Sequence, residues 1–145
     1  MTTMTAQTTQ VYSVFIRATP EQVWDAITKA EFTQQYFFGA RIEVRDGRRF
    51  SAISDFEWDE EVFEADPPRK LVHGWTAGYD AEMAAEAESR VTWEIEPQDG
   101  GITKLTVVHD QLEGAPKTAE SVAGGWMYVL SGLKTLLETG EPLTG

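Results

Sequence analysis

The sequence has no cysteine in its 145 residues, and only two histidines. Without cysteine the protein has no disulfide scaffold, no thiol nucleophile and no cysteine-ligated metal, which fits a reducing compartment. Two histidines are too few for a histidine-rich metal site. No apolar run approaches the roughly 20 residues that span a bilayer, and no secretory signal is visible at the start. We therefore expect a cytoplasmic protein without a metal or other cofactor.

Basic residues are also scarce. There are 12 Lys and Arg against 24 Asp and Glu, giving a formal net charge of −12. Binding to nucleic acid or to an anionic membrane needs stripes of Lys and Arg, so neither is expected as a partner. The five Trp, seven Phe and four Tyr argue for a packed core. The length suits one domain, which we place at residues 11–140 between tails at 1–10 and 141–145.

Common catalytic and cofactor motifs are missing. The sequence contains no GxxxxGK[ST], GxGxxG, HExxH or GxSxG motif and no EF-hand loop. These absences remove the commonest nucleotide, zinc, calcium and hydrolase sites. We therefore assign no catalytic and no metal-binding residue, and we rank binding above catalysis.

The order of predicted elements is a strand, two short helices, about six strands and a long helix. Thr19, Pro20 and Gln22 form a helix start with a capping box, and Asp46-Gly47 is a strong hairpin turn. The strands are expected at 11–17, 41–45, 50–54, 56–65, 70–75, 89–96 and 102–109. The helices are expected from 19 onward, at 31–37 and at 120–138, with a helical or mobile excursion at 79–88.

The last helix carries one apolar stripe that includes Trp126 and Leu133. Gly125 and Gly132 lie on the flank of that stripe. Each glycine costs about 1 kcal/mol against alanine in a helix interior, which indicates a packing or cavity reason for it. An antiparallel sheet wrapped on this helix is the simplest way to bury the stripe, so the fold class is α+β.

Alternation along the strands predicts which side chains point inward. His73 and Trp75 share a face with Leu71, and Trp93 and His109 lie on similar apolar faces. Two interpretations stay open for each histidine: a hydrogen-bonded structural residue, or a group that orients a ligand or acts as a general acid–base. The tryptophans are either core residues or the wall of an aromatic pocket.

Two clusters of opposite charge are neighbours in the sequence. The acidic run at 55–66 is expected to be a solvated or partner-facing edge, although paired carboxylates also occur in glycosidases and cation sites. A basic cluster would either balance that strand, which we favour, or bind an anionic ligand group; its members are Arg41, Arg45, Arg48 and Arg49. The inward faces are expected to be almost free of charge.

Four stretches carry a family resemblance: 16–26 (IRATPEQVWDA), 65–75 (ADPPRKLVHGW), 103–109 (TKLTVVH), and GW at 125–126 followed by LKTL at 133–136. With them the chain resembles the AHSA-type family, named for the C-terminal domain of the activator of the ninety-kilodalton heat-shock protein's ATPase, within the START-like helix-grip superfamily (SRPBCC). The resemblance implies a curved sheet of six or seven strands around a long C-terminal helix, with a cavity between them. Superfamily members bind lipids, sterols, polyketides and other apolar molecules, a few catalyse ring closure or hydrolysis, and some contact heat-shock proteins of the stress response.

The leading interpretation is a domain that binds a small apolar or aromatic molecule between sheet and helix. The alternatives are an interaction module for a heat-shock chaperone, or a cyclase or hydrolase that uses a cavity histidine. A monomer and a homodimer are both compatible with the sequence. The expected ligand-contacting residues are Tyr36, Phe37, His73, Trp75, Trp93, His109 and Trp126.

Overall fold

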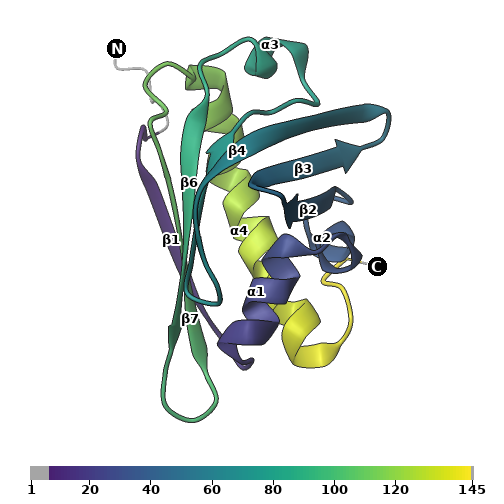
Figure 1. Cartoon of the computed structure of the whole chain (residues 1–145), viewed down its shortest axis with the longest axis vertical. Helices are drawn as coiled ribbons and strands as arrows, with labels where there is room; N and C mark the ends of the chain where they lie inside the picture. The colour runs from purple at the N-terminus through teal and green to yellow at the C-terminus, as the bar shows by residue number, and fades with distance from the viewer. Residues whose placement is uncertain (1–6, 145) are drawn as a thin grey trace.

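The structure is a computed structural model that describes residues 7–144. Within these residues, seven antiparallel strands form one sheet, accompanied by four helices (Figure 1). The strands are β1 (Gln10–Ile16), β2 (Arg41–Arg45), β3 (Arg48–Ile53), β4 (Phe56–Asp66), β5 (Lys70–Trp75), β6 (Ser89–Pro97) and β7 (Thr103–Asp110). The helices are α1 (Pro20–Thr28), α2 (Ala30–Tyr36), α3 (Ala81–Ala84) and α4 (Pro116–Thr139). The predicted tails at 1–10 and 141–145 lie partly outside the described residues.

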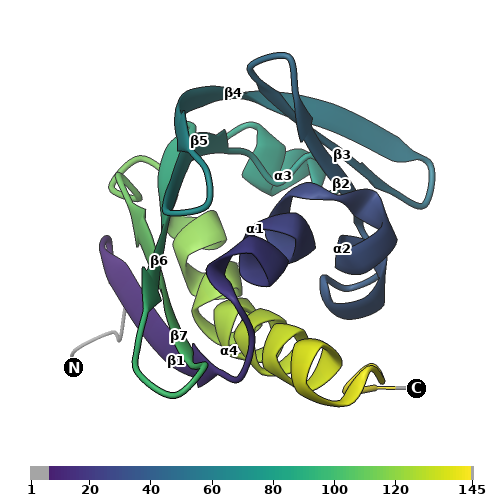
Figure 2. The same ribbon diagram turned by 60° about the horizontal axis from the view of Figure 1, so that its bottom comes forward.

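The sheet has the strand order β1-β7-β6-β5-β4-β3-β2. A register shift between Val62 and Glu64 interrupts the pairing of β4 with β5, and such a bulge bends a strand. The sheet curves, and α1, α2 and α4 lie on its concave side (Figure 2). This arrangement confirms the predicted α+β helix-grip fold. Within residues 7–144, no helix combines the length and the apolar character that crossing a membrane requires.

Helix α1 begins as the sequence predicts. The Gln22 backbone N–H donates to the Thr19 hydroxyl at 3.1 Å, and the Gln22 side chain accepts from the Thr19 N–H at 2.8 Å. Pro20 occupies the first helical position, where its missing N–H is not needed. All the groups of this cap come from four consecutive residues, which is why the pattern is visible in the sequence.

Helix α4 begins differently. It starts at Pro116 rather than at the expected Glu120, and its N-cap residue Ala115 offers no side-chain hydrogen bond. The Glu86 carboxylate takes that role, accepting from the N–H groups of Lys117 and Thr118 at 2.9 Å each. These hydrogen bonds lower the pKa of Glu86 in spite of the opposing effect of desolvation. Because this cap comes from the connection after α3, the local sequence marks the start of α4 by Pro116 at the first helical position but offers no capping side chain.

The β2–β3 hairpin turns at the predicted residues. Asp46 and Gly47 have φ values of 53° and 74°, and Arg45 pairs with Arg48 across the turn. Two consecutive residues with positive φ match the two-residue turn that suits the twist of a hairpin. Strand β3 therefore begins at Arg48, two positions before the predicted strand, and this register decides which β3 side chains face inward.

The core lies between the sheet and α4, and the expected inward faces are confirmed. Leu71, Val91, Leu105 and Val107 are fully buried, as are the two histidines. Gly132 has the packing reason that the sequence suggests, because a Cβ there would lie 3.1 Å from the Cβ of Tyr36. The missing side chain allows α2 to approach α4 closely.

Candidate functional site

A cavity of about 270 Å³ lies between α4 and the β2–β4 part of the sheet. Three of its lining residues, Phe38, Tyr79 and Ser121, are exposed, so the cavity opens to solvent beside them. Most of the wall is apolar, with a few polar side chains. The lining residues are Phe37, Phe38, Ala40, Ile42, Arg49, Ser51, Ile53, Trp58, Trp75, Thr76, Tyr79, Ser121, Val122, Gly125, Trp126 and Val129.

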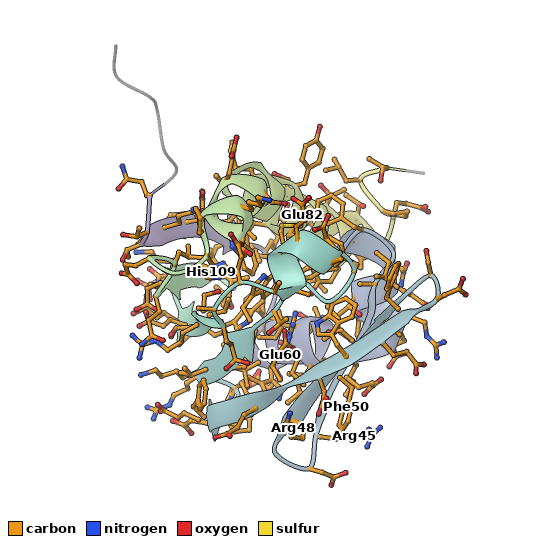
Figure 3. All side chains as sticks on the ribbon, turned by 90° about the horizontal axis from the view of Figure 1, so that it is seen from above. Arg45, Arg48, Phe50, Glu60, Glu82 and His109 are labelled. Carbon is orange, nitrogen blue, oxygen red and sulfur yellow. The ribbon has the colours of Figure 1, made fainter. Side chains whose placement is uncertain are left out.

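Alternation along β3 determines which of its side chains line the cavity on the sheet side. Arg49, Ser51 and Ile53 occupy alternate positions of β3 and therefore share a face. Arg49 pairs with Glu60 of β4, and Ser51 pairs with Trp58, so the four side chains belong to one inward patch. In Figure 3 Glu60 lies toward the middle of the molecule, whereas Arg45, Arg48 and Phe50 lie toward its outer side.

Helix α4 supplies the opposite wall. Val122, Gly125, Trp126 and Val129 fall on one helical face. A Cβ at Gly125 would meet only Phe38, at the ordinary contact distance of 3.8 Å. Gly125 thus has the cavity reason that the sequence suggests: it leaves open a space that a larger side chain would fill.

Arg49 and Glu60 form a buried ion pair. Nη1 of Arg49 lies 3.3 Å from Oε1 of Glu60, and the two side chains are 3% and 0% exposed. The second Glu60 oxygen accepts from the Thr76 backbone N–H at 3.0 Å. Desolvation raises the pKa of Glu60, while the positive charge of Arg49 opposes that rise. The Arg49 guanidinium also lies over the rings of Trp75, at 5.2 Å, and Phe37, at 5.7 Å, which holds it against the cavity wall.

The inward faces predicted for β5, β6 and β7 carry no charged side chain, but β3 and β4 bury this ion pair, for which no inward face was predicted. Glu60 is the buried member of an acidic run that is otherwise mainly exposed. Arg48 and Asp59 pair on the outside at 2.7 Å, so the basic cluster does balance the acidic strand there. Hydropathy alone would place the apolar Phe50 on the inward face of β3. It faces outward instead, beneath Arg45, with 4.1 Å between the guanidinium carbon and the ring centre.

A signal for the inward arginine is nevertheless present in the sequence. The Asp46-Gly47 turn fixes the register that pairs Ile42 with Ser51. Ile42 is buried, and its partner across the hairpin lies on the same face. Ser51, and with it Arg49 two positions away, must therefore face the interior.

Four buried polar atoms of cavity-lining residues have no hydrogen-bond partner in the described part of the chain. They are Arg49 Nε, Ser51 Oγ, Trp58 Nε1 and Trp75 Nε1. The Trp58 indole lies near enough to lower the pKa of Glu60, but its geometry falls outside that of a normal hydrogen bond. Unpaired polar atoms are uncommon in protein interiors, and all four of these belong to residues around one cavity.

The two histidines lie in a fully paired group beside the cavity. His73 Nδ1 donates to the Gly74 carbonyl at 2.7 Å, and its Nε2 accepts from Trp93 Nε1 at 2.9 Å. An indole nitrogen only donates, so Nε2 of His73 carries no proton. Desolvation, with the charge of Arg49 as a smaller cause, places the pKa of His73 well below its usual range.

His109 follows the same rule with the opposite tautomer. Its Nδ1 accepts from Trp126 Nε1 at 3.0 Å, which leaves Nε2–H to donate to the Ser89 hydroxyl at 2.8 Å. Burial lowers the pKa of His109 to about 4. Both nitrogens of each histidine are thus occupied, as expected for the structural interpretation of these residues.

The structure divides the seven predicted contact residues into two groups. The cavity wall includes Phe37, Trp75 and Trp126. The packed core beside it holds Tyr36, His73, Trp93 and His109. Tyr36, for example, donates its hydroxyl proton to the Ala26 carbonyl at 2.6 Å. Sequence reasoning did not select Arg49, Ser51, Trp58 or Tyr79 for the wall. Among residues 7–144, no group of three His, Asp or Glu side chains is arranged to hold a metal ion.

Comparison with known proteins gives a family and a fold. The family model described as "Activator of Hsp90 ATPase homolog 1-like protein" matches residues 17–138. No curated protein matches the chain.

Three solved structures share the architecture. EF2215 of Enterococcus faecalis, a conserved protein of unknown function, has 19% identity and a TM-score of 0.74 over 91% of this chain and 72% of its own. CalU16 of Micromonospora echinospora has 20% identity and a TM-score of 0.69 over 94% and 77%. The Aha1 dimer of Colwellia psychrerythraea has 14% identity and a TM-score of 0.72 over 92% and 98%. At these identities the likeness concerns the fold alone.

Proposed function

The chain belongs to the family of Activator of Hsp90 ATPase homolog 1-like proteins, and from this premise we propose that it binds a small apolar or amphipathic molecule between the sheet and α4. A shared fold does not define a function, so the proposal depends on the site. The observation that carries it is the cavity of about 270 Å³ with its largely apolar, aromatic wall. Apolar contact with that wall supplies most of the affinity.

The volume limits the size of the ligand. An apolar cavity of about 150 Å³ accepts benzene, so 270 Å³ suits a molecule of about two fused rings. Phe37, Trp75 and Trp126 form an aromatic cluster in the wall, with ring centres 5.4–6.2 Å apart. Flat rings pack well against such a cluster.

The test is a pair of glycine variants with tetralin, a neutral two-ring hydrocarbon, as the probe. Gly125→Leu puts a side chain into the cavity, whereas Gly124→Leu makes the same change at an exposed neighbour with open space around it. We expect tetralin to raise the melting temperature and change the tryptophan fluorescence of the wild type and of Gly124→Leu, but not of Gly125→Leu. Equal binding by both variants, or a wild type that binds neither tetralin nor its ketone 1-tetralone, would overturn the proposal.

A second candidate is self-association through an exposed apolar patch. Phe38, Tyr128 and Leu143 are 59%, 62% and 46% exposed and border one shallow groove. Exposed apolar patches mark interaction sites, and the similar Aha1 of Colwellia psychrerythraea is described as a dimer. We propose a second copy of this chain as the occupant.

Analytical ultracentrifugation tests this candidate over a range of protein concentrations. Tyr128→Lys should weaken the dimer at least tenfold, while Val11→Lys, at an exposed apolar residue on β1, should not. A wild-type protein that stays monomeric at all concentrations contradicts self-association.

A heat-shock chaperone stays a predicted partner because of the family's description. The corresponding assay measures the ATPase rate of Hsp90 from the same organism with and without this protein. An unchanged rate at low salt argues against that partner.

A further inference from the structure

The cavity wall indicates the chemistry of its ligand. We infer that the ligand is a neutral molecule of about two rings with a carbonyl oxygen, and that this oxygen accepts hydrogen bonds from Arg49 and Trp75. The inference rests on the proposed binding function and adds the polar group that the ligand carries.

The unpaired atoms at the wall form a donor set. Arg49 Nε and Trp75 Nε1 can only donate, and Ser51 Oγ can do either. The three side chains lie together, because the guanidinium is 5.2 Å from the Trp75 ring and Ser51 shares the β3 face of Arg49. All three residues are more than nine-tenths buried. A ligand group that complements them must be a hydrogen-bond acceptor.

The charge at the wall selects a neutral acceptor over an anion. The positive charge of Arg49 is already matched by Glu60, 3.3 Å away and fully buried. A ligand carboxylate would add a second buried negative charge with no counter-charge of its own, which is costly. His73 and His109 supply no further positive charge, because each accepts an indole N–H on a nitrogen that carries no proton. A carbonyl oxygen uses the free donors without changing the charge.

Three probes of the same two-ring frame test this inference: tetralin, 1-tetralone and 1,2,3,4-tetrahydro-1-naphthoate. They differ in having no acceptor, a neutral carbonyl or a carboxylate. Titration calorimetry of the wild-type protein should show 1-tetralone binding at least tenfold more tightly than tetralin, and also more tightly than the carboxylate.

The variant Glu60→Gln tests whether the charge of the ion pair, rather than the shape of the cavity, selects a neutral ligand. The variant keeps the size of the side chain and leaves Arg49 with an unmatched positive charge. The ratio of carboxylate affinity to ketone affinity should rise at least tenfold. A ratio that stays the same would show that the ion pair does not select the ligand's charge, and the neutral-ligand inference would be wrong.

Indole N–H resonances give a readout that depends on no variant. Binding of 1-tetralone, but not of tetralin, should move the Trp75 indole N–H signal downfield, while those of Trp93 and Trp126 stay with their histidine partners. If tetralin and 1-tetralone bind equally and leave Trp75 at the same position, the inference fails although the binding function stands. If no probe binds, the binding function itself fails.

Discussion

The interior of this protein has two polar regions that differ in how completely they are paired. Around His73 and His109, indole, imidazole and hydroxyl groups meet one another at 2.8–3.0 Å. Around the cavity, one ion pair leaves the Nε of Arg49 and the Trp75 indole nitrogen without partners. Tryptophan indoles thus have hydrogen-bond acceptors in the first region, whereas the Trp75 indole has none in the second.

This difference in pairing suits the two regions to different tasks, one to holding the fold together and the other to the proposed binding of a ligand. A completed network holds the sheet and α4 in one arrangement and has no capacity for another molecule. An unpaired buried donor costs free energy, and a ligand that satisfies it recovers that cost on binding. If the cavity binds a ligand as proposed, the two aromatic-rich halves of the interior have different roles, even though both look like core in the sequence.

The largest expected effect comes from breaking the ion pair at the cavity. Arg49→Met leaves the Glu60 carboxylate buried without its counter-charge, so the free energy of unfolding should fall by about 3–5 kcal/mol. The double variant Arg49→Met with Glu60→Gln removes both charges and should recover most of the loss. Urea denaturation measures both. A double variant as unstable as the single one would show that packing, not charge, holds this region.

Acid should weaken the paired region by a similar amount. The pKa of His109 is about 4 in the fold against 6.5 in a free side chain, so the unfolded chain binds more protons between these values and stability falls as pH falls. Each tenfold change in proton affinity is about 1.4 kcal/mol, so the loss from pH 7 to pH 4 is about 3 kcal/mol from His109, and His73 acts in the same direction.

Glu60 opposes this trend, because its raised pKa makes the folded protein the better proton binder as pH falls. Glu60→Gln should therefore steepen the loss of stability between pH 6.5 and pH 4, and His109→Phe should flatten it. Urea midpoints at several pH values measure the slopes. Equal slopes in the wild type and His109→Phe would contradict the lowered pKa of His109 in the folded protein.

A matched pair of tryptophan variants compares the two regions directly. Trp93→Phe leaves Nε2 of His73 without its donor, whereas Trp75→Phe removes an N–H that has no partner. Both lose similar apolar area, so the difference between their unfolding free energies isolates the pairing. Trp93→Phe should be less stable by about 1–3 kcal/mol. The reverse order would mean that the Trp75 indole is paired in solution.

The smallest effect is expected from two serines. Ser89→Ala removes the acceptor of the His109 Nε2–H, and should cost about 1 kcal/mol. Ser51→Ala removes an unpaired buried hydroxyl and should be neutral or stabilising. Thermal unfolding of the two variants side by side measures the difference. Equal melting temperatures would show that the paired Ser89 hydroxyl stabilises the fold no more than the unpaired Ser51 hydroxyl does.

Features that depend on neighbouring residues could be predicted from the sequence. The Thr19 capping box, the Asp46-Gly47 turn and the inward faces of β5, β6 and β7 are each encoded within one segment. Features that join distant segments could not. Glu86 caps α4 from a distant segment, and the helix begins four residues before the predicted start. Arg49 pairs with Glu60 of the neighbouring strand, which buries two charges on strands for which no inward face was predicted.

Alternation along the strands predicts burial but not the position of a cavity. Aromatic residues on inward faces were correctly expected inside, but alternation does not distinguish a residue beside a cavity from one in solid packing. That distinction depends on the space between α4 and the sheet, which the missing side chain of Gly125 leaves open on the α4 side.

The position of β1 has a consequence for how the chain folds during synthesis. Gln10 lies opposite His109, so the first strand of this sheet to be synthesised pairs with the last one. Until β7 has been made, β1 has no partner strand, and Val14 and Ile16 lack the core residues of β7 and α4 that they join in the finished fold. Pairing over so long a sequence distance is slow and leaves nascent strands open to aggregation. The completed sheet and its cavity therefore form together, and only after β7 and α4 have been translated.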